Sequence, residues 1–189
     1  MRIIHLILLL TAFIAFSCMD SSVNNQIADE NDYQLLKLPA KSELSAETEF
    51  SVTKNINGDE GGSIILNNAY KNAQGKWVVI AAYLYVPAGA FSGSENITLK
   101  VDDDFAAVSC SPGMVFNKSL ELSLTFTGLN LLEMGINNQN ADFAYISNDG
   151  SLEYLEYSNL TVNTNLGKIS VKDAKLNHFS RFGFIKKHE

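Results

Sequence analysis

Apolar and polar residues alternate along several short segments of the chain. The pattern is clearest in residues 96–101, 119–127 and 168–172. A period of two places one side of a strand on a core and the other side in water. The residues predicted to face inward are Ile97, Leu99, Val101, Leu120, Leu122, Leu124 and Phe126.

Residues 77–86 are apolar at both odd and even positions. Val78, Ile80, Ala82 and Leu84 alternate with Trp77, Val79, Tyr83 and Tyr85. This pattern predicts either a central strand covered on both sides or a strand with an exposed aromatic face. Pro87 lacks a backbone N–H and should end the strand, and Gly89 suits a turn that needs a positive φ.

Turn-forming residues separate these segments, for example at residues 57–58, 73–75, 111–113 and 148–150. Strands that recur at intervals of about 8–12 residues, without a convincing helical pattern, are typical of an all-β sandwich. We therefore predict one antiparallel β-sandwich domain over residues 47–189.

Residues 1–17 have the pattern of an export signal. Arg2 precedes an almost wholly apolar run over residues 3–16, which is shorter than the roughly 20 residues that a membrane-spanning helix needs. Ala15 and Ser17 are the small residues that signal cleavage prefers. A plain secretory peptide cut before Cys18 is one interpretation. The sequence Ala15-Phe16-Ser17-Cys18 also resembles the lipobox of bacterial lipoproteins, which implies lipidation of Cys18. Residues 18–46 are then the lipidated cysteine and a polar, flexible tether.

Composition narrows the possible functions. The formal net charge is −7, with 14 basic and 21 acidic residues, which argues against a nucleic-acid partner. The chain has 3 histidines and 2 cysteines, so a His-rich metal site is not expected. With Cys18 lipidated, Cys110 has no disulfide partner and is expected to be a small buried hydrophobic residue. No cofactor is expected.

Three groups of residues are candidates for binding. Asp102, Asp103 and Asp104 form a weak candidate Ca²⁺ site, since a solvated loop explains the run equally well. Glu153 and Glu156 are a possible carboxylate pair for glycoside hydrolysis, or simply the outer side of a strand over residues 152–157. The third group is a set of aromatic side chains, which are either core residues or a platform for stacking sugars: Trp77, Tyr83, Tyr85, Tyr154 and Tyr157.

The order of several short motifs over about residues 60–185 resembles the zonula-occludens/netrin-receptor (ZU-five) domain. These motifs are Gly61-Gly62, residues 86–91, the strand at 96–101, residues 111–116 and residues 178–182. The chain also looks like envelope lipoproteins of Bacteroidetes-type bacteria with this arrangement. The resemblance implies a β-sandwich and a role in protein contacts, and it implies no particular substrate.

The resemblance also raises one possible reaction. In some relatives a His-Phe-Ser motif cleaves itself between Phe and Ser, which maps onto His178, Phe179 and Ser180. His178 would take the proton of the Ser180 hydroxyl, Ser180 would attack the Phe179 carbonyl carbon, and water would hydrolyse the resulting ester. The alternative is a structural final strand in which His178 and Ser180 share one face with Leu176, Phe182 and Phe184.

We therefore expect a lipid-anchored protein of the bacterial cell envelope, with the outer membrane as its expected location. Its expected role is structural or in protein interaction, without catalysis. A self-cleaving domain and an envelope carbohydrate-binding module are the alternatives, and the expected partners are the membrane and an envelope protein or glycan.

Overall fold

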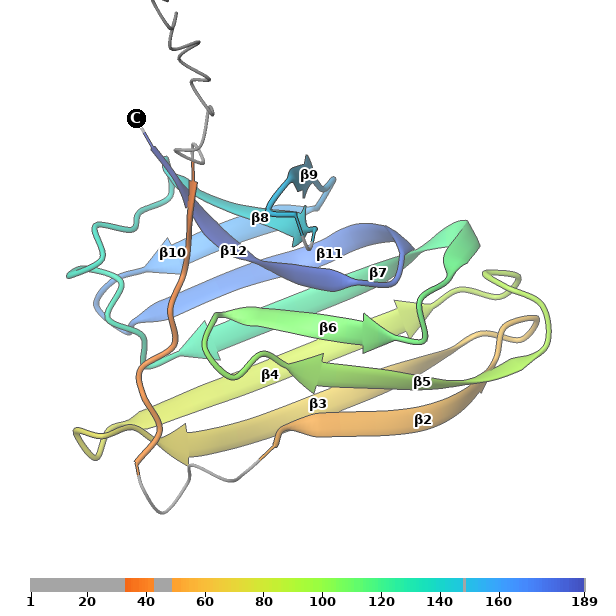
Figure 1. The fold of residues 1–189 in the computed structure, drawn as a ribbon, viewed down its shortest axis with the longest axis horizontal. Helices are drawn as coiled ribbons and strands as arrows, with labels where there is room; N and C mark the ends of the chain where they lie inside the picture. The colour runs from red at the N-terminus through yellow and green to blue at the C-terminus, as the bar shows by residue number, and fades with distance from the viewer. Residues whose placement is uncertain (1–32, 43–48, 148, 189) are drawn as a thin grey trace, which may run out of the picture.

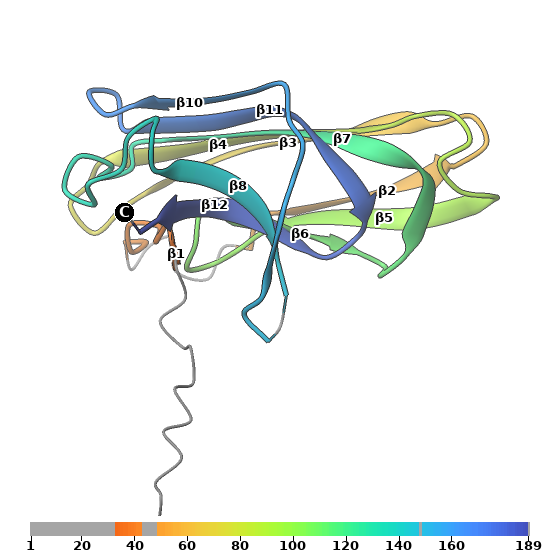
Figure 2. The same cartoon turned by 90° about the horizontal axis from the view of Figure 1, so that it is seen from above.

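The computed structural model describes residues 33–42, 49–147 and 149–188, and every strand pair in it is antiparallel. Two sheets pack face to face, as Figures 1 and 2 show. The predicted all-β sandwich is confirmed.

The five-stranded sheet has the order β10-β11-β7-β4-β3. Its strands are β3 (Gly62–Lys71), β4 (Trp77–Val86), β7 (Val115–Thr127), β10 (Asn159–Asn163) and β11 (Lys168–His178).

The seven-stranded sheet has the order β2-β5-β6-β12-β8-β9, and β1 also pairs with β12. Its strands are β1 (Tyr33–Leu35), β2 (Ser51–Asn57), β5 (Ser94–Val101), β6 (Ala107–Ser111), β8 (Ala141–Ile146), β9 (Leu152–Tyr154) and β12 (Arg181–Lys187).

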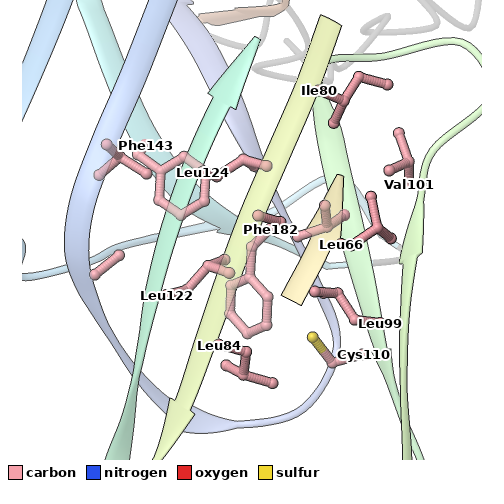
Figure 3. Close-up of a cluster of buried hydrophobic side chains, with 14 of the residues drawn as sticks. Leu66, Ile80, Leu84, Leu99, Val101, Cys110, Leu122, Leu124, Phe143 and Phe182 are labelled. Carbon is pink, nitrogen blue, oxygen red and sulfur yellow. The ribbon is translucent and has the colours of Figure 1, made fainter. Parts of the chain in front are cut away.

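The alternating residues of the strands form the core between the sheets. Ile97, Leu99 and Val101 on β5 are buried, as are all four predicted inward residues of β7. Figure 3 shows Leu84 and Leu122 of the five-stranded sheet meeting Leu99 and Phe182 of the other sheet. Phe184 of β12 joins the layers, because its ring lies edge-on to Phe126 of β7 at a centroid distance of 6.2 Å.

Local sequence explains how β4 ends. The strand stops at Val86, directly before Pro87, as predicted. Gly89 has a φ of 82°, which confirms the predicted turn. Gly61 has a φ of 78°, and a Cβ atom there would lie 2.5 Å from the Val86 carbonyl oxygen. The close approach of these two segments therefore requires glycine at position 61.

The domain begins earlier than residue 47. Tyr33–Leu35 pairs with Ile185–Lys187 of β12, and Leu36 is completely buried. Residues 33–42 therefore belong to the sandwich, which corrects the tether predicted over residues 18–46 for this part. Three paired residues are too few to show a period of two, so the sequence pattern gave no signal for this strand.

A bulge at Asp173 keeps β11 in register with β7. Val171 pairs with Leu124 and Ala174 with Leu122, so β11 contains one extra residue between these two pairs. Asp173 adopts a φ of 53°, and its backbone N–H donates to the Ser123 hydroxyl at 3.1 Å. The extra residue turns both Val171 and Ala174 into the core, although they differ in parity.

Truncation of an inward residue tests this register. Leu122 is fully buried, so Leu122→Ala is expected to lower the free energy of unfolding by about 2–5 kcal/mol. Thr125 stands on the outer side of the same strand, and Thr125→Ala should change that free energy by about 0.5 kcal/mol or less. Urea denaturation followed by circular dichroism measures both, and equal losses would contradict the register.

Candidate functional site

The His-Phe-Ser motif lies where the chain passes from one sheet to the other. β11 ends at His178 and β12 begins at Arg181, so Phe179 and Ser180 connect the two sheets. The Phe179 N–H donates to the Met114 carbonyl at 2.8 Å, and the Ser180 carbonyl accepts from the Cys110 N–H at 2.8 Å. The alternative of one continuous final strand is therefore wrong, because a change of sheet interrupts it.

The three side chains of the motif have different surroundings. His178 Nε2 lies 3.5 Å from Glu153 Oε2, and the imidazole lies edge-on to the Tyr145 ring at a centroid distance of 4.7 Å. Phe179 is buried and packs edge-on against Phe116. Within the described residues, His178 makes no hydrogen bond to Ser180. In this conformation the imidazole therefore faces a carboxylate and an aromatic ring instead of the serine hydroxyl.

Two of the three aspartates after β5 contact cations of the chain itself. Asp102 Oδ2 lies 2.9 Å from Arg181 Nη2, and Asp102 Oδ1 accepts from the N–H groups of Asp104 and Phe105. Asp103 Oδ1 lies 2.9 Å from Lys41 Nζ. In the part of the chain that the structure describes, no group of three or more His, Cys, Asp or Glu residues is placed to hold a metal ion.

Of the two cysteines, the structure describes only Cys110. Cys18 and the predicted signal lie outside the described residues. Cys110 is buried in β6, and burial raises the pKa of its thiol to about 12. The prediction of a small buried hydrophobic residue is confirmed, and a thiol with this pKa is a poor nucleophile near neutral pH.

The predicted aromatic platform is divided between separate places. Trp77, Tyr83 and Tyr85 point outward from β4, whereas Tyr154 lies on β9 in the other sheet. Tyr157 is half-buried and donates its hydroxyl to Asp142 Oδ1 at 2.8 Å. Burial and this carboxylate raise the pKa of Tyr157 to about 12. Tyr157 therefore has a structural partner.

The outward residues of β4 continue onto β3 and form an exposed apolar band. Tyr83 pairs with Ile65, whose side chain is 59% exposed, and Trp77 is 58% exposed. We call this surface the β4 band, and it comprises Ile65, Trp77, Val79, Tyr83 and Tyr85. It has hydroxyl groups along one side, because Thr127 and Ser123 of β7 pair with Val79 and Tyr83.

The sequence pattern does not single out Ile65 as an exposed residue. It lies between Ile64 and Leu66, which are both buried, so the three residues form an apolar run without visible alternation. A shallow depression of about 210 Å³ lies beside Ile65 and Tyr83, with Asn67, Ser123 and Thr125 among its other lining residues.

A second hollow lies where the chain crosses between the sheets after β9. The Glu156 carbonyl accepts from the Lys175 N–H at 2.8 Å, which attaches the crossing segment to β11. Figure 2 shows this segment running from β9 to β10 across the two layers. The hollow has a volume of about 510 Å³, and we call it the β9 groove. It is lined by Ser119, Glu153, Tyr154, Leu155, Glu156, Lys175 and Asn177.

Several groove side chains are held by neighbours. Lys175 forms an ion pair with Glu121, and Ser119 Oγ lies 2.6 Å from Asn177 Oδ1. Glu153 is the carboxylate that faces His178. The groove therefore brings together both candidate glutamates, one candidate tyrosine and the histidine contact, from segments that are distant in the sequence.

No family model matches the chain, and neither a curated protein nor a solved structure matches it. Within the described residues, no helix has the length and apolar character needed to cross a membrane.

Proposed function

We propose that this chain is a lipid-anchored protein of the bacterial cell envelope whose sandwich domain contacts a partner protein. The β4 band is the observation that carries the interaction role. Exported proteins rarely leave several neighbouring apolar side chains exposed unless something binds to them. Four of its five residues lie on the outward side of β4, whose other side is buried in the core.

The anchor is argued from the sequence. An apolar segment with a positive start and small residues before Cys18 supports lipidation at that residue. The other cysteine, Cys110, is a free thiol buried in the core. The order of motifs supports a relationship to the ZU-five domain, for which a β-sandwich is the required fold.

The position of β1, the first described strand, leaves the β4 band accessible to a partner. β1 enters the sandwich beside β12, in the seven-stranded sheet. The β4 band lies on the outer side of the five-stranded sheet, and Figure 2 shows the two sheets as separate layers with β1 next to the other one. The attachment and the band are therefore on different layers, so one does not cover the other.

We assign the His-Phe-Ser motif a structural role. Its backbone is bonded to residues of β6 and of the segment before β7, and Phe179 is buried. Cleavage between Phe179 and Ser180 would need His178 to leave Glu153 and Tyr145 and reach the Ser180 hydroxyl. A structural role of the motif needs no such movement of His178.

If Cys18 carries the lipid anchor, its replacement should release the protein from the membrane. Cys18→Ala should abolish labelling by a clickable palmitate analogue and move the protein from the membrane to the soluble fraction, because the acyl chains supply the membrane affinity. Cys110→Ala is the matched control and should remain labelled. Unchanged labelling of Cys18→Ala would rule out lipidation at this residue.

If the His-Phe-Ser motif is structural, the chain should stay intact between Phe179 and Ser180. After long incubation at neutral pH, mass spectrometry of the denatured protein should show no species that ends at Phe179. Ser180→Ala should give the same mass pattern, apart from the substitution itself. A fragment ending at Phe179 that disappears in Ser180→Ala would establish self-cleavage instead.

The β4 band predicts a contact inside the envelope. Replacing Tyr83 by p-benzoylphenylalanine keeps an aromatic side chain at an exposed position and should give a discrete cross-linked adduct in cells. The same replacement at Lys172, an exposed residue of β11, is the control and should give no such adduct. Trp77→Ser in the same chain should weaken the Tyr83 adduct. Equal adducts at both positions, or none at Tyr83, would contradict the proposed contact surface.

A further inference from the structure

The β9 groove has the size of a small-ligand site. Its volume of about 510 Å³ lies within the range of roughly 300–1,000 Å³ that is usual for such sites. Five of its seven lining residues are polar or charged: Ser119, Glu153, Glu156, Lys175 and Asn177. A ligand that fits here needs hydrogen-bonding groups over most of its surface.

The groove offers both donors and acceptors. Ser119 uses its hydroxyl hydrogen on Asn177 Oδ1, which leaves the Asn177 Nδ2 hydrogens as donors. The Glu156 carboxylate has no ion pair or hydrogen bond with any described residue, so its oxygens are available as acceptors. Glu153 keeps acceptor capacity beside its contact with His178.

The groove has one aromatic lining residue. Tyr154 is 58% exposed, and it is the last residue of β9, a three-residue strand at the edge of its sheet. Tyrosine combines an apolar ring face with a polar hydroxyl. A pyranose has the matching surfaces, because one face of the ring presents C–H groups and its rim presents hydroxyls that both donate and accept.

The charges of the groove disfavour other ligands. Two glutamates repel an anion such as a phosphate. Lys175 is already neutralised by Glu121, and the described residues around the groove do not gather three metal-ligating side chains. A ligand without charge and with many hydroxyls satisfies the donors and acceptors at the smallest desolvation cost.

We infer that the β9 groove binds a neutral saccharide. Tyr154 stacks on the sugar ring, Glu156 and Glu153 accept hydrogen bonds from its hydroxyls, and Asn177 donates to a ring or hydroxyl oxygen. This site is separate from the β4 band, so the domain binds a glycan with one surface and a protein with another.

The test uses the full-length protein in detergent on an array of neutral gluco-, galacto- and manno-oligosaccharides. The strongest oligosaccharide is then titrated by calorimetry. Tyr154→Ala is expected to weaken binding about tenfold or more, and Glu156→Gln should also weaken it, because a charged acceptor is replaced by a neutral amide. Both residues are exposed, and an unchanged melting temperature confirms that each variant is folded.

Tyr83→Ala is the matched control, since it removes an exposed tyrosine from the β4 band and should leave the affinity unchanged. Three results would overturn the inference: no binding to any oligosaccharide on the array, binding that survives Tyr154→Ala, or binding that is lost in Tyr83→Ala. The last result would place the sugar on the β4 band. The cross-linking result at Tyr83 does not depend on the first two results, so the protein contact can stand when the saccharide site fails.

Discussion

The packing of two apolar sheet faces is the interaction on which the structure depends. β4 and β7 supply one side of the core, and β5 and β12 supply the other. Along its length β4 is apolar on both sides. Val78, Ile80 and Leu84 are completely buried, whereas the outward residues Trp77, Val79 and Tyr83 are between 43% and 58% exposed. The core uses one side of β4, and the other side is largely exposed.

The alternation of apolar and polar residues correctly predicted the strands β5 and β7. On β5 and β7 every predicted inward residue is buried, since a shift of one position would expose the whole set. For β4 the sequence left two possibilities open, and the structure has the exposed aromatic face. The sequence could not decide between them because the answer depends on what covers the far side of the sheet.

Other features depend on contacts that a local pattern does not contain. β1 pairs with the part of β12 that lies beyond the end of β6. Its three residues are too few to show a period of two in the sequence. The bulge at Asp173 changes the parity of β11, and its supporting Ser123 comes from β7. The change of sheet at Phe179 and Ser180 was missed because no glycine or proline marks it. The β9 groove collects residues from β7, β9, the following crossing segment and β11, so only the tertiary structure reveals it.

The central claim is that the outward side of β4 is covered in the envelope. Hydroxyl-radical footprinting of the protein in intact envelopes and after purification measures this directly. Trp77 and Tyr83 should be modified several-fold less in the envelope than in the purified protein, while Leu166, an exposed residue of the same layer, should be modified equally in both. Equal modification of Trp77 and Tyr83 in the two preparations would contradict the account.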